Sequence, residues 1–135
     1  IKQIKRYILN NDLENEIFLP NYITKEEAHQ YYQNALLYVF PSIDEGFGIP
    51  IIEAFSYSLP IICSDIPVFR EIANESVSFF NKGNFISLSK KIQILINSED
   101  LRKELSKKGK SQLNKFSRKN FIKGFEDLII DWNGK

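Results

Sequence analysis

Short apolar runs alternate with amphipathic segments along the first 80 residues of the chain. The runs lie at residues 17–19, 36–40, 61–63 and 77–80, and such runs are typical of strands covered on both faces. The segments between them have a helical pattern, and from residue 85 onward the whole pattern is helical. Strands that alternate with helices predict parallel pairing, so we expect an α/β fold with a Rossmann-like, three-layer parallel sheet.

Capping residues and prolines give the expected helix boundaries. The chain opens in a helical pattern, and Thr24 with Glu27 predicts a capping box for a helix that runs to about residue 34. Pro50 and Pro67 each mark the first turn of a helix, because a proline there removes no intrahelical hydrogen bond. We expect Asp65 to cap the helix that Pro67 begins.

The rest of the chain is expected to be helical throughout. Ser98 and Ser117 are the expected N-caps of the last two helices. The apolar face of the final helix comprises Phe121, Phe125, Leu128 and Trp132.

The composition narrows the class of protein. With 135 residues, 43% of them apolar and 26% charged, the chain has the size and balance of one globular domain. Its apolar runs are too short to cross a bilayer, which takes about 20 residues. Cys63 and His29 are the only cysteine and histidine, so an internal disulfide and a structural zinc site are excluded and a reducing compartment is favoured. The sequence does not begin with Met, and we expect it to be a piece of a longer protein.

The charge is unevenly distributed. Residues 102–123 contain nine Lys or Arg residues and one acidic residue, a local net charge of +8 in a chain whose overall net charge is +1. A basic helical stretch can bind anionic lipid or nucleic acid, but such stretches are more often the solvated face of a helix. The solvated face is the favoured interpretation, and contact with anionic lipid is the alternative.

Residues 41–55 carry the strongest functional signal in the sequence. Gly46 and Gly48 allow a ligand to approach the backbone closely. Pro50 begins a helix, and the unpaired amide groups at a helix N-terminus form a binding site for anions such as a diphosphate.

Two carboxylates belong to the same stretch. Glu45 lies in the loop and Glu53 about one turn into the helix, where both can accept hydrogen bonds from hydroxyl groups. Ligands of parallel sheets bind at the carboxyl ends of the strands, so loop 41–48 is expected to share one edge with loops 20–24 and 64–67. Glycines, a helix start and two carboxylates together suit a ligand with phosphates between two polyols.

This stretch matches a longer pattern. It reads Pro41-Ser42-x-x-Glu45-Gly46-Phe47-Gly48, and Glu53 completes a Glu-x7-Glu spacing. The pattern closely resembles the signature of family 4 glycosyltransferases, the group 1 transferases, which have the two-domain GT-B fold. The resemblance covers nearly all 135 residues, as the second half of the carboxy-terminal, donor-binding domain. Its further matching segments are 17–23, 31–35, 60–64, 67–72 and 116–117.

The resemblance implies a role for each matching residue. Glu45, the expected catalytic residue, would face the hydroxyls of the donor sugar, and Glu53 would bind the ribose hydroxyls. No metal or other cofactor is implied, and the leaving phosphate of a nucleotide-diphosphate sugar would help to deprotonate the acceptor. The other expected donor-binding residues are Ser42, then Gly46, Phe47 and Gly48 beside the sugar and diphosphate, Ile51 and Ile52 at the phosphate, and Asn21 and Tyr22 near the base.

The sequence also departs from the family pattern. The family usually has glycine where Asn21 and Ser58 stand; Asn tolerates a left-handed backbone, whereas Ser58 at a helix end is less favourable. Nothing in the chain matches the family's acceptor domain, or the two strands that open its donor domain with a glycine-rich turn and phosphate-neutralising Arg and Lys. We therefore expect four strands that close up or borrow a strand from another copy, and no transferase activity from this chain by itself.

The sequence thus predicts the donor-binding part of a retaining glycosyltransferase of bacterial polysaccharide biosynthesis. It would transfer a hexosyl-type sugar to a glycan or lipid-linked acceptor, with the amino-terminal domain as its partner in cis and no nucleic acid involved. The alternatives are a non-catalytic nucleotide-sugar-binding or interaction module and a GT-B nucleotide-sugar epimerase. We expect a cytoplasmic location, with peripheral contact at the inner face of the membrane if the basic stretch binds lipid.

Overall fold

The chain folds as two compact units, one from Ile1 to Gln30 and one from Tyr31 onward. They are described by a computed structural model that covers residues 1–117 and residue 120. The expected final helix, with Phe121, Phe125, Leu128 and Trp132, lies outside the described residues.

The first unit contains α1 (Lys2–Asn10) and the beginning of α2 (Lys25–Asn34). The capping box of α2 is confirmed: the Thr24 amide donates to the Glu27 carboxylate at 2.8 Å, and the Glu27 amide donates to Thr24 Oγ1 at 3.2 Å. The two bonds satisfy orphan amide groups on both sides of the helix start.

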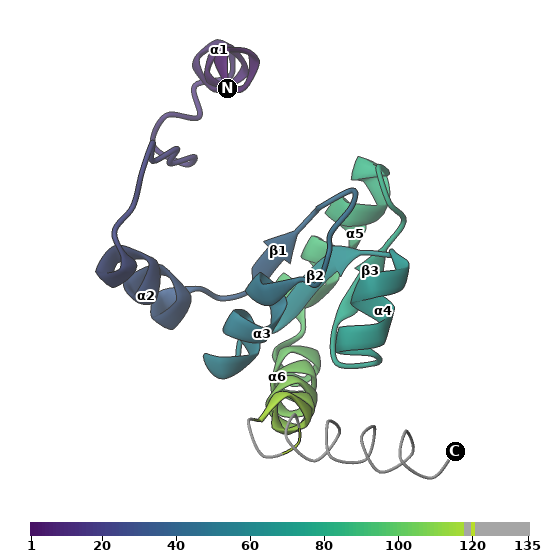
Figure 1. The fold of residues 1–135 in the computed structure, drawn as a ribbon. Helices are drawn as coiled ribbons and strands as arrows, with labels where there is room; N and C mark the ends of the chain where they lie inside the picture. The colour runs from purple at the N-terminus through teal and green to yellow at the C-terminus, as the bar shows by residue number, and fades with distance from the viewer. Residues whose placement is uncertain (118–119, 121–135) are drawn as a thin grey trace, which may run out of the picture. The chain divides into compact units, whose positions relative to one another are not determined.

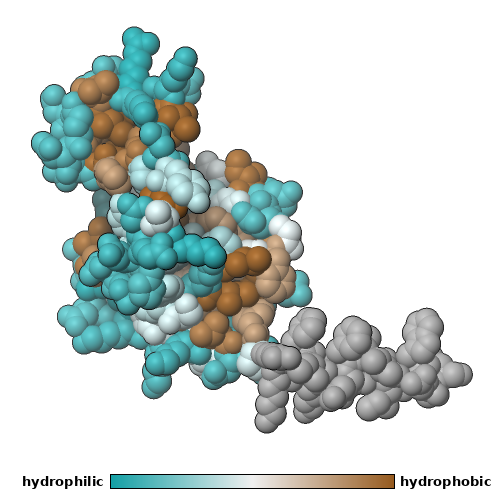
Figure 2. Space-filling view, turned by 60° about the vertical axis from the view of Figure 1, so that its left-hand side comes forward, coloured by the Kyte–Doolittle hydropathy of each residue, from teal (hydrophilic) through white to brown (hydrophobic). Residues whose placement is uncertain are grey.

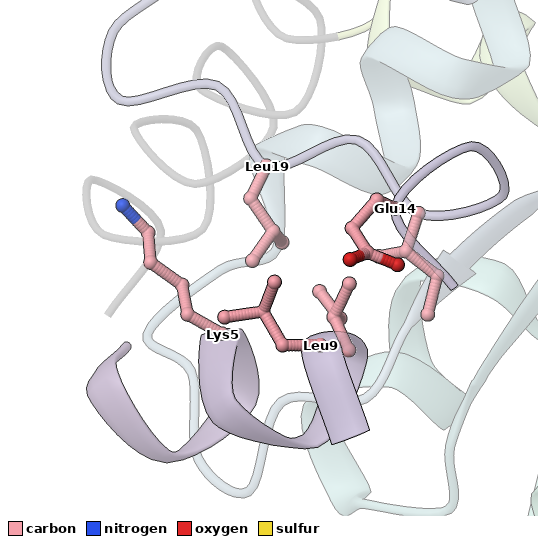
Figure 3. A pocket seen from close by; sticks show the side chains of 6 residues that line it. Lys5, Leu9, Glu14 and Leu19 are labelled. Atoms are coloured by element: carbon pink, nitrogen blue, oxygen red, sulfur yellow. The ribbon is translucent and has the colours of Figure 1, made fainter. Parts of the chain in front are cut away.

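The strand expected at residues 17–19 is wrong, because this segment has no strand structure. Its side chains are 39% to 72% exposed, and a strand needs a neighbouring strand to satisfy its backbone groups. The segment instead lines a cavity of about 250 Å³ within the first unit. Figure 3 shows four of its lining residues by name, with the amino group of Lys5 pointing outward. The complete lining is Lys5, Ile8, Leu9, Glu14, Ile17 and Leu19.

The second unit is built on a parallel sheet of three strands, β1 (Tyr38–Phe40), β2 (Ile61–Ser64) and β3 (Ser78–Phe80), in the order β1-β2-β3 (Figure 1). Parallel pairing is confirmed for the three strands. The register places Val39 opposite Ile62 and Cys63 opposite Phe79. Three strands within the described residues replace the expected four, because segment 17–19 forms none.

Helices follow each strand. They are α3 (Ile49–Ser56), α4 (Pro67–Ala73), α5 (Phe85–Asn97), α6 (Glu99–Leu113) and the 3-10 helix η1 (Asn114–Phe116). Pro50 and Pro67 lie in the first turns of α3 and α4, as expected. Ser98 is confirmed as the N-cap of α6, since its Oγ accepts from the Leu101 amide at 3.3 Å.

Two cores lie on opposite faces of the sheet, because successive strand residues point to opposite sides. Ile61 and Cys63 of β2 pack with Phe55 of α3 and Phe69 of α4. Ile62 points the other way and packs with residues of β3, α5 and α6, namely Phe80, Leu95 and Leu105. The three layers that the sequence predicts are therefore present: α3 and α4 on one face, the sheet, and α5 and α6 on the other.

The later turns of α6 also reach α3. Gly109 of α6 is buried, and its missing side chain leaves room for the ring of Phe55, which is itself fully buried. Nearby, the buried Gln112 donates from Nε2 to the carbonyl of Ile72 in α4 at 2.6 Å. Helix α6 is therefore fixed to both helices of the first core.

Ser58, one of the departures noted above, has a φ of +56°. The chain thus keeps the left-handed backbone that a glycine would adopt at this helix end, although a non-glycine residue pays about 1 kcal/mol or more for it.

Gly109→Ala is expected to destabilise the fold by about 1–2 kcal/mol. The added methyl would lie 2.8 Å from Phe55 Cε1, and this overlap outweighs the gain of about 1 kcal/mol in helix propensity. Urea unfolding measures the change, with the neighbouring exposed Lys110→Ala as the control. A stabilised Gly109→Ala variant would contradict the close packing of α6 on α3.

Candidate functional site

The loop from Pro41 to Gly48 leads from the carboxyl end of β1 into α3. Its first turn is held by side-chain hydrogen bonds. Ser42 Oγ lies 2.9 Å from Glu45 Oε1 and 3.0 Å from the Asp44 carbonyl oxygen, and the Glu45 amide donates to Asp44 Oδ1 at 3.1 Å. A hydroxyl has one proton, and the charged carboxylate is the stronger acceptor. The direction of the Glu45 carboxylate, five residues beyond the end of β1, is thus fixed by Ser42.

The two glycines of the loop have different surroundings. A Cβ added at Gly46 would have nothing within 4 Å, so the backbone there faces open space that a ligand can occupy. Gly48 is buried, has a φ of +84° and is the N-cap of α3. A Cβ at Gly48 would lie 3.0 Å from Phe69 and 3.1 Å from Ile72. Gly46 therefore leaves the loop accessible, whereas Gly48 allows the loop to pack on α4.

The first turn of α3 has no side-chain cap, and no acidic residue stands in it. Amide groups at such a helix start remain available to an anion. The Ile51 amide donates to the Gly48 carbonyl at 3.0 Å, and the Ile51 side chain is fully buried while that of Ile52 is half-buried. The assignment of the Ile51 and Ile52 amides to phosphate stays a prediction.

Glu53 is exposed on α3, and a cluster of tyrosines adjoins it. The Tyr32 hydroxyl lies 3.4 Å from Glu53 Oε2. The Tyr32 ring stacks on that of Tyr57 with centroids 5.0 Å apart and lies 5.6 Å from that of Tyr38. Burial, Tyr38 and the charge of Glu53 together raise the pKa of Tyr32, so its hydroxyl stays protonated and can donate to the carboxylate. No spacing in the sequence indicated that this hydroxyl meets Glu53.

The carboxyl end of β2 leads to a charged pair. The expected side-chain cap by Asp65 is wrong, because Ile66 is the N-cap of α4 and makes no side-chain cap bond. Asp65 binds Arg70 instead, accepting from Nε at 2.5 Å and from Nη2 at 2.6 Å. These hydrogen bonds lower the pKa of Asp65. The guanidinium, which lies 5.1 Å from the centroid of the Phe79 ring, is therefore already paired with a carboxylate.

Ser64, the last residue of β2, ends at the same edge of the sheet. Its side chain is buried, and within the described residues Oγ has no hydrogen-bond partner. Leaving a buried hydroxyl unpaired costs about 1–3 kcal/mol. This edge of the sheet therefore contains an unused donor and acceptor that the sequence did not point to.

Asn21 and Tyr22 belong to the first unit, where both are exposed, Tyr22 to 88%. Their expected place near the base of a nucleotide stays a prediction. Among residues 1–117 and 120, no helix is long and apolar enough to cross a membrane. No group of three or more His, Cys, Asp or Glu residues in that part of the chain could hold a metal ion.

The chain matches the family model described as glycosyl transferases group 1 over residues 2–112. It is 36% identical over 78 residues to the O-antigen chain mannosyltransferase RfbU of Salmonella typhimurium, a match that covers 58% of this chain and 22% of that protein. It is also 36% identical over 90 residues to the capsular polysaccharide biosynthesis glycosyltransferase CapM of Staphylococcus aureus, covering 64% of this chain and 24% of that protein.

The fold has solved counterparts as well. The crystallised C-terminal domain of LpcC, a glycosyl transferase group 1 family protein from Francisella tularensis, superimposes with a TM-score of 0.74 at 20% identity. That match covers 84% of this chain and 60% of the LpcC domain. The α/β fold with three parallel strands is therefore that of the C-terminal domain of such proteins. The chain spans only about a quarter of the length of the two bacterial relatives.

Gly48→Ala is expected to destabilise the second unit by about 2–4 kcal/mol. The alanine would be strained in the left-handed backbone conformation, and its methyl group would also overlap side chains of α4. Gly46→Ala is the matched control, since its added methyl meets nothing within 4 Å, and its effect should stay within about 0.5 kcal/mol. Urea unfolding of both variants measures the difference. Equal effects would contradict the packing of Gly48 on α4.

Proposed function

The chain belongs to the group 1 glycosyltransferases, and on that premise we propose that it is part of the donor-binding domain of a retaining transferase. Such an enzyme moves a sugar from a nucleotide-diphosphate sugar to a glycan or lipid-linked acceptor. The observation that carries the proposal is the placement of Glu45 and Glu53 on one loop and helix at the carboxyl end of β1. Ligands of parallel sheets bind at this end of the strands.

The donor would lie along the loop. Glu45, directed by Ser42 at 2.9 Å, would accept hydrogen bonds from the hydroxyls of the donor sugar. The open backbone at Gly46 would let the sugar and diphosphate approach the amides of the loop. The N-terminus of α3 would favour the negative charge of the diphosphate, which grows as the bond to the sugar breaks.

The nucleoside would lie toward Glu53. The exposed Glu53 carboxylate would bind the ribose hydroxyls, and Asn21 and Tyr22 would lie near the base. The leaving phosphate would take up the proton of the acceptor hydroxyl as the new glycosidic bond forms, so no protein base or metal ion would be needed for that proton.

The remainder of the enzyme would lie in a longer protein. The relatives are about four times as long as the parts that match, which supports a separate acceptor domain and further strands with cations for the diphosphate. The names of RfbU and CapM support a hexosyl donor and a place in polysaccharide biosynthesis. The single cysteine, buried and unpaired, supports a reducing, cytoplasmic location.

Binding of the nucleotide tests this proposal. We expect UDP or GDP to bind the chain in isothermal titration and Glu53→Ala to weaken binding about 10- to 150-fold, the effect of losing a hydrogen bond to a charged group. Glu104→Ala removes a carboxylate from the exposed face of α6 and should leave binding unchanged. With a nucleotide sugar added, the chain by itself should form no glycoside product. Equal binding by the parent and Glu53→Ala would contradict the assigned ribose site.

We also propose that the basic stretch 102–123 contacts anionic lipid. Its net charge supports this, although Lys103 and Lys108 already pair with Glu99 and Glu104 at 2.6 and 2.7 Å. We expect the chain to float with vesicles that contain anionic lipid and not with neutral ones, and the reversal Lys107→Glu with Lys110→Glu to reduce flotation. Equal flotation with neutral vesicles would remove the electrostatic argument for lipid contact.

A further inference from the structure

Phe47 of the loop has an aromatic partner far along the chain. Phe47 stands between Gly46 and Gly48 and is 52% exposed. Its ring nevertheless meets the ring of Phe116 in η1, with centroids 6.2 Å apart and planes at 88°. This edge-to-face geometry is the attractive arrangement for two aromatic rings.

Phe116 is itself held in place on both sides. Before it, the buried Gln112 at the end of α6 donates to the Ile72 carbonyl at 2.6 Å. After it, Asn120 Nδ2 donates to the Asn114 carbonyl at 2.6 Å, and the Ser117 amide donates to the same carbonyl at 3.3 Å. The ring of Phe116 is thus presented from a bonded turn that is fixed to α4.

The loop is therefore supported at two neighbouring residues by two different elements. Gly48 packs on Phe69 and Ile72 of α4, and Phe47 packs on Phe116 of η1. Ile72 belongs to both supports, since its side chain meets Gly48 and its carbonyl holds Gln112. Glu45 and Gly46 precede these two supported residues directly, and the space around Gly46 is open.

We propose that Phe116 is a positioning residue for the donor loop. Its contact with Phe47 fixes the conformation of residues 45–48, so that the Glu45 carboxylate and the loop amides are arranged before the donor binds. This inference rests on the proposed function for the meaning of "donor", but the support of the loop by Phe116 can be tested without any ligand. Preorganisation of this kind raises affinity because less conformational entropy is lost on binding.

Amide hydrogen exchange tests the support itself. Phe116→Ala should speed the exchange of the Glu45 and Ile51 amides, which donate to Asp44 Oδ1 and to the Gly48 carbonyl, about two- to twelve-fold, the size expected from losing one aromatic pair. The amides of β2 should not change. Phe116→Tyr keeps the ring edge and should restore the parent rates, and Phe85→Ala, which removes a ring that is 79% exposed at the start of α5, should leave the loop unaffected.

Titration with UDP tests the consequence for the donor. Phe116→Ala should weaken UDP binding by a similar two- to twelve-fold factor, and Phe116→Tyr should restore it. If the parent chain does not bind UDP, the proposed function fails for this chain, while the exchange rates still decide whether Phe116 supports the loop. If the loop amides exchange at the same rate in Phe116→Ala as in the parent, the proposal is overturned.

A variant on the other side of the contact covers the case in which Phe116→Ala disturbs α6 as a whole. Phe47→Ala removes the same ring pair from the exposed loop. It should speed the exchange of the Ser117 and Asn120 amides, which belong to the turn around Phe116. If both amides exchange at the parent rate, the proposal is overturned. Faster exchange at both amides supports it.

Discussion

Strand β2 is buried on both of its faces, and the second unit depends on this strand. Ile61, Ile62 and Cys63 are fully buried, yet they alternate between two separate cores. Each core needs its own helices to cover it, which is why α3 and α4 lie on one side and α5 and α6 on the other. The strand has only four residues, so its stability comes from the side chains on both faces and from pairing with β1 and β3, and little comes from its length.

Close contacts between helices then connect the two faces. The absence of a side chain at Gly109 lets α6 reach Phe55 of α3, and Gln112 bonds to the end of α4. The second unit is therefore held together by direct contacts between its helices as well as by the two cores on the faces of the sheet. Gly48 uses the same principle in the loop, where the missing Cβ makes room for Phe69 and Ile72. Two glycines, one in a helix and one at a helix N-cap, set how closely these elements approach.

The candidate site combines a rigid base with an open surface. Gly48 and Phe47 attach the loop to α4 and η1, while Gly46 faces open space and Glu45 is directed by Ser42. Glu53 stands on α3, where Tyr32 can donate to it. A ligand would thus meet carboxylates whose directions are set before it arrives, which reduces the entropy lost on binding. The charge that would oppose a diphosphate is absent from the first turn of α3, since no acidic residue lies there.

The elements of the second unit and the candidate residues of its loop could be predicted from local sequence patterns. Pro50 and Pro67 marked the helix starts and Ser98 marked a cap, because each of these effects acts within a few residues of the chain. The spacing from Glu45 to Glu53 indicated the candidate site. The remaining features depend on contacts between distant parts of the chain. Segment 17–19 has the composition of a strand but no neighbour to pair with, and Asp65 bonds to Arg70 in preference to capping α4. The contacts of Phe47 with Phe116 and of Glu53 with Tyr32 join residues far apart in sequence. Such contacts depend on how the helices pack on the sheet, and no local pattern of residues contains that information.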